Sequence, residues 1–146
     1  MATFSRHADV DWNGSIMEGK GQVTGGSGAF TLPVTFPARI GEPAGHTSPE
    51  ELVAAAHAAC YAMALNATVG RKGGSIARTR VTATVSADKG DSGIKLTTSK
   101  LKVVVEGLQG IEAGDFEAVA KQAEGGCPIS NALRGSLAIE LETEVR

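Results

Sequence analysis

Cys60 and Cys127 are the only two cysteines in the chain, and both lie where a thiol could react. Cys60 lies within the apolar segment EELVAAAHAACYAMAL (50–65), and Cys127 directly precedes Pro128 in GGCPISNAL (125–133). A free cysteine in a core is often only a small apolar packing residue. At a predicted helix start, however, the backbone N–H dipoles favour the thiolate, which is the reactive form. Each cysteine is therefore either a packing residue or a reactive thiol.

His57 lies three residues before Cys60, so the two side chains share one face of the predicted helix. It could be a base for Cys60, a metal ligand, or a helix histidine that is hydrogen-bonded to its neighbours. A zinc site built from His57, Cys60 and Cys127 would still need His7 or His46 as its fourth ligand. No close Cys-x-x-Cys or His-x-x-x-His spacing supports such a site, so we expect no metal and favour the hydrogen-bonded histidine.

Arg39 and Glu50 flank the Pro- and Gly-rich segment PARIGEPAGHT (37–47), which predicts a loop. A guanidinium close to Cys60 would lower the pKa of the thiol and stabilise a developing oxyanion. Glu50 could hold Arg39 through a bidentate ion pair. The alternative roles are a solvated surface arginine and a carboxylate that faces the positive end of the helix dipole.

The order of predicted elements indicates an α+β fold with mainly antiparallel sheets packed on helices, in a single domain over residues 1–146. Ser48 fits a helix N-cap, Pro49 the first helical position and Glu51 a capping box, so a helix should run from there to about Gly70. Alternating apolar residues predict a hairpin after it. The predicted strands cover 4–12, 15–24, 29–36, 80–88, 94–107 and 136–145, and the short helices 114–124 and 125–133.

The composition is that of a globular protein, with 42% hydrophobic and 21% charged residues and a net charge of −2. The charge balance offers no basic surface for a nucleic acid. Glu50, Glu51, His57 and Asn66 interrupt the most apolar run, so we expect no membrane span. The first residues lack the pattern of a signal peptide, so we expect a cytoplasmic protein whose thiols are not locked in a permanent disulfide.

Three segments of the chain resemble the OsmC/Ohr family of osmotically inducible and organic hydroperoxide resistance proteins. They are TSPEELVAAAHAACYAMAL (47–65), GCPISNAL (126–133) and WNGSIMEGKGQV (12–23). The likeness extends over essentially the full chain, and the HAAC string is more similar to the OsmC branch. Ser48 stands where the family usually has Asn, a change that keeps an N-cap.

The resemblance implies antiparallel sheets packed on a long central helix in an intertwined homodimer. It also implies a thiol peroxidase without metal or haem, active in oxidative or osmotic stress defence. Cys60 would attack an organic hydroperoxide and become a sulfenic acid, and Cys127 would then close a disulfide with it. A dithiol, either a lipoyl-type compound or a lipoylated protein, would reopen the disulfide. Arg39 and Glu50 match the family's remaining active-site positions.

Glu50 and Cys60 are ten residues apart, which is about 15 Å along a straight helix. Glu50 could not hold an arginine against Cys60 of its own chain over that distance. We therefore expect Arg39 and Glu50 to reach Cys60 of the partner subunit. A second subunit would also cover the long helix, which is apolar on nearly every side.

Two other functions compete with the peroxidase. One is a non-enzymatic, small-molecule-binding α+β dimer whose cysteines are structural. The other is a metal-dependent hydrolase that uses His57, Cys60 and Cys127. Consumption of peroxide that depends on Cys60 distinguishes the peroxidase from both.

Overall fold

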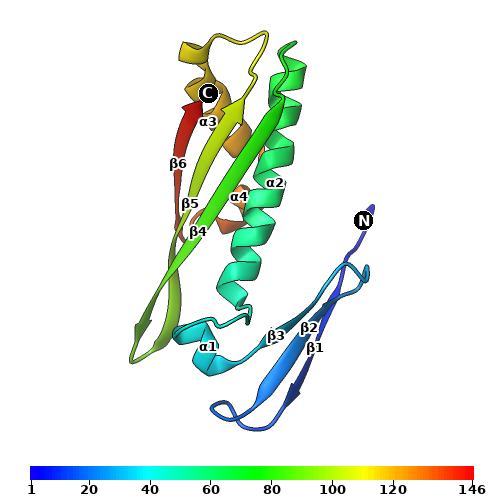
Figure 1. The fold of residues 1–146 in the computed structure, drawn as a ribbon, viewed down its shortest axis with the longest axis vertical. Helices are drawn as coiled ribbons and strands as arrows, with labels where there is room; N and C mark the ends of the chain where they lie inside the picture. Colours follow the sequence, from blue (N-terminus) through cyan, green and yellow to red (C-terminus); the bar gives the residue numbers. More distant parts are fainter. The chain divides into compact units, whose positions relative to one another are not determined.

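The structure is a computed structural model that describes all residues from Met1 to Arg146. The chain divides into two compact units, Met1–Leu52 and Val53–Arg146, called here the N-terminal and the C-terminal unit. The elements, labelled in Figure 1, are β1 (Ala8–Asn13), β2 (Lys20–Gly25), β3 (Thr31–Val34), α1 (Phe36–Ile40), α2 (Pro49–Arg71), β4 (Arg78–Gly90), β5 (Gly93–Glu106), the 3₁₀ turn Ala113–Asp115, α3 (Phe116–Gly126), α4 (Pro128–Leu133) and β6 (Ala138–Val145).

Strands β1, β2 and β3 form an antiparallel sheet in the N-terminal unit. Each of them overlaps one of the three strands predicted for this part of the sequence. Val10 pairs with Val23, and Val23 with Leu32, so apolar side chains line one face of this sheet. Gly21 lies opposite Trp12, and a Cβ built at Gly21 would come within 2.8 Å of the indole ring. Glycine at this position therefore lets the indole lie across the neighbouring strand.

The predicted loop over 37–47 contains a short helix, α1, so Arg39 lies on a helix. Thr35 caps this helix, because its hydroxyl accepts a hydrogen bond from the Ala38 N–H at 3.2 Å. Pro37 occupies the first turn, where its missing N–H is not needed. The prediction of a loop was therefore wrong as far as Ile40, because the Pro and Gly content hid these helix-start signals.

Helix α2 begins as the sequence predicts. The Ser48 hydroxyl accepts a hydrogen bond from the Glu51 N–H at 3.1 Å. The Glu51 carboxylate accepts a 2.8 Å bond from the Thr47 hydroxyl, which is not the contact that a capping box predicts. By length and composition alone α2 could cross a bilayer, which corrects the expectation that its polar residues interrupt the apolar run. The core helix of a globular unit meets the same criterion.

The sheet of the C-terminal unit has the order β4–β5–β6. Strands β4 and β5 form the predicted antiparallel hairpin. Strand β6 runs parallel to β5, with Leu101 opposite Leu141, so the expectation of antiparallel sheets is wrong for this pair. The reason is the connection, because the chain passes through α3 and α4 after β5 and returns to start β6 from the same end.

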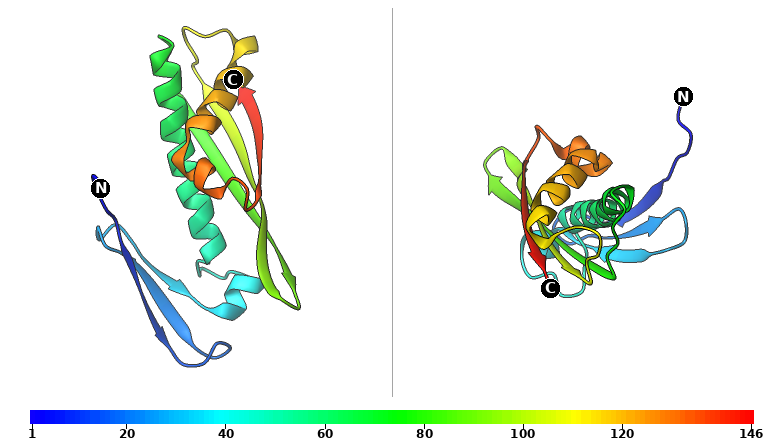
Figure 2. Two further views of the ribbon diagram at one scale, coloured as in Figure 1. Left: turned by 180° about the vertical axis from the view of Figure 1, so that it is seen from behind. Right: turned by 90° about the horizontal axis from the view of Figure 1, so that it is seen from above.

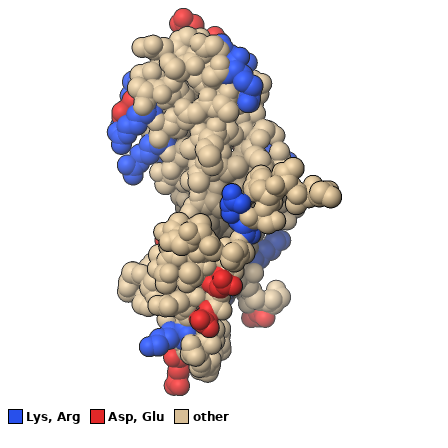
Figure 3. Space-filling model, turned by 90° about the vertical axis from the view of Figure 1, so that its right-hand side faces the viewer, with Lys and Arg blue, Asp and Glu red and all other residues tan.

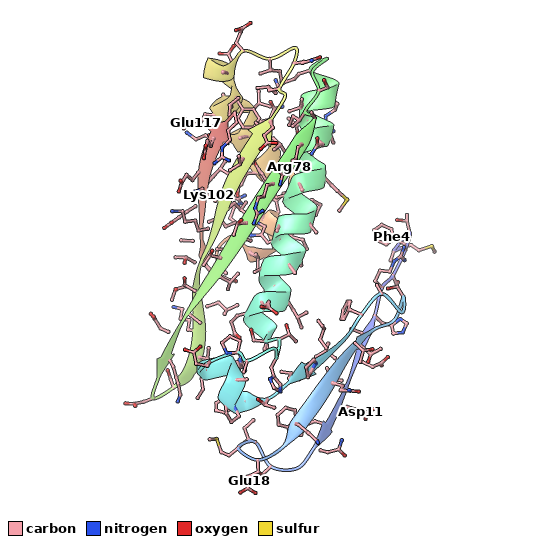
Figure 4. All side chains as sticks on the ribbon, in the orientation of Figure 1. Phe4, Asp11, Glu18, Arg78, Lys102 and Glu117 are labelled. Atoms are coloured by element: carbon pink, nitrogen blue, oxygen red, sulfur yellow. The ribbon has the colours of Figure 1, made fainter.

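Helices α2, α3 and α4 cover one face of this sheet, as Figure 2 shows from behind. Their inward side chains form one buried core with those of β5. The buried members are Tyr61, Leu65, Val69, Leu101, Val103, Val105, Phe116, Val119, Ala120, Ala123 and Cys127. Arg78 and Lys102, labelled in Figure 4, lie on the opposite face of the sheet and are exposed. The fold thus buries Cys127 among apolar side chains.

Candidate active site

The two cysteines come from different elements of the C-terminal unit. Cys60 lies near the middle of α2 and is partly buried against the core, whereas Cys127 is fully buried at the start of α4. Cys127 is the N-cap of α4, and its Sγ accepts a hydrogen bond from the Ser130 N–H at 3.5 Å. Both thiols are free.

Cys60 packs against the buried cluster that contains Cys127, and the Cys127 side chain is close enough to affect the pKa of Cys60. Burial raises the pKa of the Cys60 thiol, and the neighbouring Cys127 side chain raises it further. The Ile129 N–H, in the first turn of α4, acts in the opposite direction, but the net shift of this pKa is upward. The fold therefore brings together two thiols that the sequence could pair only through a resemblance.

Arg39 and Glu50 lie together in the N-terminal unit. The guanidinium donates three hydrogen bonds to the carboxylate, two from Nε at 3.1 Å and one from a terminal nitrogen at 2.7 Å. Partial burial alone would raise the pKa of Glu50, but the hydrogen bonds and the charge of Arg39 outweigh it and lower this pKa. The two-pronged pair that the sequence suggested is therefore present and stays ionised at neutral pH.

An apolar hollow of about 280 Å³ opens beside Arg39 in the N-terminal unit. Its lining combines side chains from the sheet, α1 and the start of α2, namely Val10, Trp12, Ile16, Val23, Val34, Thr35, Phe36, Arg39, Pro49 and Leu52. Arg39 is the only charged residue among them. Sequence reasoning missed this hollow, although Ile16 in a turn and Trp12 on a short strand were signals of apolar side chains without an obvious core.

His57 is fully buried, and both of its ring nitrogens are hydrogen-bonded. Nδ1 lies 2.6 Å from Ser99 Oγ, and Nε2 lies 2.7 Å from Ser130 Oγ. Of the three roles considered for His57, the hydrogen-bonded helix histidine is the one that the structure confirms. Since both nitrogens are occupied, neither is free to bind a metal.

Ser99 and Ser130 did not stand out in the sequence. The one available signal is the position of Ser99 in the inward-facing alternation with Leu101, Val103 and Val105, where a serine needs a partner. No group of three or more His, Cys, Asp or Glu side chains in the structure could hold a metal ion. The candidate site residues are two free thiols in the C-terminal unit and an ion-paired guanidinium and carboxylate in the N-terminal unit.

A protein-family model described as OsmC-like protein matches residues 41–142. The chain is 37% identical over 141 residues to Peroxiredoxin OsmC of Escherichia coli (strain K12), covering 96% of this chain and 97% of that protein. This chain belongs to the OsmC/Ohr family. It is also 41% identical over 98 residues to the organic hydroperoxide resistance protein OhrA of Bacillus subtilis (strain 168), covering 66% of each.

Solved structures of OsmC/Ohr proteins have the same fold. An organic hydroperoxide resistance protein OsmC from Legionella pneumophila matches with a TM-score of 0.77 and 27% identity over 99% of both chains. OhrB of Bacillus subtilis matches with a TM-score of 0.75 and 26% identity over 98% of this chain and all of that one. The predicted family and the α+β fold with a long central helix are thus confirmed. The predicted enzyme class, a cysteine-based peroxidase, agrees with the names of these relatives.

Proposed function

We propose that this protein reduces organic hydroperoxides to alcohols with Cys60 as the attacking thiol. The Cys60 thiolate attacks the terminal oxygen of R–O–O–H, and the O–O bond breaks. The sulfur becomes a sulfenic acid, and the alkoxide leaves and takes up a proton to give the alcohol. The membership in a family with peroxiredoxin relatives supports this reaction class.

Cys127 is the resolving thiol in this proposal. Its sulfur attacks the sulfenic sulfur of Cys60, the S–O bond breaks, and the leaving hydroxide combines with the thiol proton to form water. The observation that carries the proposal is the position of Cys127 in the buried apolar cluster against which Cys60 packs, close enough to affect the pKa of Cys60. A structural cysteine needs no second thiol beside it.

A dithiol completes the cycle by exchange with the Cys60–Cys127 disulfide. One thiolate of the donor attacks a sulfur of the disulfide, and its second thiol releases the protein as two free thiols. We propose a lipoyl-type dithiol or a lipoylated protein as this donor. We also propose that the protein works in the cytoplasm, where free thiols persist.

We propose that the positive charge of Arg39 lowers the pKa of a Cys60 thiol and so favours its thiolate form. The pKa of Cys60 is raised within its own chain, so a nearby cation is needed for a reactive thiolate at neutral pH. Glu50 and Cys60 are ten positions apart on α2, which corresponds to about 15 Å of helix. We therefore propose that Arg39, held by Glu50, serves Cys60 of the partner subunit.

A homodimer is the assembly that this arrangement requires. Helix α2 has an exposed apolar side that includes Ala55, Ala59 and Met63, and Met63 is 69% exposed. In Figure 3, which looks at the molecule from the α2 side, the upper middle of the surface is nearly free of charged side chains. Exposed apolar surface of this kind favours burial against a second subunit.

The apolar hollow beside Arg39 supports bulky organic peroxides as substrates. An alkyl or aryl group could occupy the hollow while the peroxide oxygens face the guanidinium. Hydrogen peroxide has no apolar part and would gain nothing from this lining. Cumene hydroperoxide is therefore a suitable test substrate.

The test is consumption of cumene hydroperoxide with dihydrolipoamide as reductant, in the wild type and in the Cys60→Ser and Cys127→Ser variants. We expect turnover in the wild type and none in Cys60→Ser. In the absence of dihydrolipoamide, Cys127→Ser should consume one equivalent of peroxide and stop as a Cys60 sulfenic acid. Mass spectrometry of the wild type after sub-stoichiometric peroxide should find a peptide linked through Cys60 and Cys127.

Equal peroxide consumption by the wild type and Cys60→Ser would contradict the proposal. It would favour the non-enzymatic binding protein with structural cysteines. Hydrogen peroxide tested in parallel examines the substrate class, since it should react more slowly than cumene hydroperoxide. Equal rates for the two peroxides would remove the role assigned to the apolar hollow.

A further inference from the structure

His57, Ser99 and Ser130 form a buried polar cluster that the proposed reaction does not use. The three residues belong to α2, β5 and α4, and the solvent-exposed fraction of each is 0%. Their hydrogen bonds, of 2.6 and 2.7 Å, connect positions that are 42 and 73 residues apart in the sequence. Such a cluster fixes the relative positions of three elements.

The imidazole in this cluster is held in one orientation. Burial lowers the pKa of His57, and the charge of Glu124 only partly opposes this shift, so the ring is neutral at pH 7. A neutral imidazole has one N–H donor and one acceptor nitrogen. One serine hydroxyl therefore accepts from the ring and the other donates to it, and the two bonds together fix the ring plane.

The cluster is connected to the resolving thiol of Cys127 through Ser130. Ser130 binds His57 through its hydroxyl, while its backbone N–H donates to Cys127 Sγ at 3.5 Å. Helix α4, Pro128–Leu133, has only six residues and is too short to be stable by itself. Its first turn depends on tertiary contacts, and the bond between His57 and Ser130 ties that turn to α2.

Helix α2 carries both His57, which binds Ser130, and the attacking thiol of Cys60. His57 and Cys60 are three residues apart on α2, so their side chains lie on one face. Because His57 holds Ser130, and Ser130 holds the Cys127 sulfur, the resolving thiol keeps its place relative to Cys60. The core could have been filled with apolar side chains here, so the polar cluster is not needed for burial alone.

We propose that His57 is a positioning residue for the resolving step, holding the first turn of α4 so that Cys127 stays in line with the Cys60 sulfenic acid. This inference rests on the proposed peroxidase function. It assigns His57 no contact with the peroxide and no part in the first step. Loss of His57 should therefore separate the two steps of the reaction.

The experiment follows both steps in the His57→Leu, Ser130→Ala and Thr68→Val variants. Thr68 is the matched control, because it is also a buried polar residue of α2 but hydrogen-bonds within its own helix, to the Ala64 carbonyl. Each protein is mixed with one equivalent of cumene hydroperoxide and quenched at intervals. Mass spectrometry then quantifies the Cys60 sulfenic acid, trapped with dimedone, and the Cys60–Cys127 disulfide.

We expect sulfenic acid to form at least as fast in His57→Leu and Ser130→Ala as in the wild type, because Cys127 in its native position raises the pKa of Cys60. Disulfide formation should slow by about ten- to a hundredfold, since a small misplacement of a reacting group has effects of this size. The persistent sulfenic acid should also be converted to sulfinic acid when excess peroxide is added. Thr68→Val should resemble the wild type in both steps.

A His57→Gln variant tests for rescue, because glutamine can make one of the two hydrogen bonds and should recover part of the resolving rate. If His57→Leu does not fold, Ser130→Ala decides the question. Equal slowing of both steps, or an unchanged resolving rate in Ser130→Ala, would overturn the inference while leaving the peroxidase intact. Absence of any Cys60 oxidation in the wild type would overturn the proposed function and this inference with it.

Discussion

Cys60 packs against the buried cluster that contains Cys127, and the Cys127 side chain raises the pKa of the Cys60 thiol beyond the increase that burial causes. The Ile129 N–H opposes both effects without cancelling them. A resolving thiol that lies this close is ready to react with a sulfenic acid, but it makes the first thiolate harder to form. The two demands on the site are therefore in conflict within one chain.

Cys127→Ala should lower the pKa of Cys60, because it removes the neighbouring thiol that raises this pKa. The measurement is the rate of alkylation by iodoacetamide as a function of pH, followed on the Cys60 peptide. We expect the midpoint of the curve to move to lower pH, so that alkylation at pH 8 is faster than in the wild type. An unchanged midpoint would mean that Cys127 does not act on Cys60 in solution.

Arg39→Lys should lower kcat/KM for cumene hydroperoxide, because a lysine cannot reproduce the two-pronged contact with Glu50. A decrease of up to about a hundredfold is expected, which is the lower end of the loss seen when one donor to a developing oxyanion is removed. Glu50→Gln should have an effect of similar size, since it leaves Arg39 without its charged partner. Steady-state kinetics with dihydrolipoamide measure both variants.

Arg78→Lys is the matched control for this experiment. Arg78 also pairs with a glutamate, Glu106, but the pair is 3.4 Å long and exposed on the outer face of the sheet. Exposed pairs of this kind contribute little, typically about 0–1 kcal/mol. A loss of activity in Arg78→Lys as large as in Arg39→Lys would show that the Arg39 effect is not specific to the site.

Local signals explain most of what the sequence predicted correctly. Ser48 and Pro49 mark the start of α2, and the alternation of Leu101, Val103 and Val105 marks a strand with one buried face. Each of these features is decided within a few residues of the chain. The ion pair of Arg39 and Glu50 spans eleven positions, and the residue types on either side of one short segment suggested it.

Tertiary choices explain what the sequence did not predict. The parallel pairing of β6 with β5 depends on which edge of the hairpin the returning chain reaches, and no residue within β6 encodes that choice. The hydrogen bond between His57 and Ser130 joins residues 73 positions apart, so the local sequence around either residue does not predict its partner. The proximity of Cys60 and Cys127 is of the same kind, and only the family resemblance suggested it.

Met63→Glu should shift the proposed homodimer towards the monomer. A charge on the exposed apolar side of α2 would lose its hydration when a second subunit covers it, which costs several kcal/mol for an unpaired ion. Ala59→Glu should act in the same direction. Sedimentation equilibrium over a range of protein concentrations measures the change in the dissociation constant.

Gln122→Glu adds the same charge to an exposed position of α3 and serves as the control. It should leave the association unchanged. If Met63→Glu and Ala59→Glu associate as the wild type does, the apolar side of α2 is not the dimer interface. The proposal that Arg39 acts on Cys60 of the partner subunit would then lose its structural basis.

The buried, neutral state of His57 should make the protein less stable as the pH falls. Burial lowers the pKa of His57 in the folded state, whereas in the unfolded chain it stays near 6.5. Below that pH the imidazole of His57 is protonated in the unfolded chain but stays neutral in the folded protein. The free energy of unfolding therefore decreases by up to about 1.4 kcal/mol per pH unit until the folded-state pKa is reached.

Urea unfolding at pH 7.5 and pH 5.5 measures this difference in the wild type and in His57→Gln. The variant retains His7 and His46, which are outside the cluster, but it lacks the proton-binding group of the core. We expect its stability to fall less between the two pH values than that of the wild type. Equal decreases in both proteins would mean that His57 takes up a proton in the folded state, and the two serine hydroxyls would then both have to accept hydrogen bonds from a charged ring.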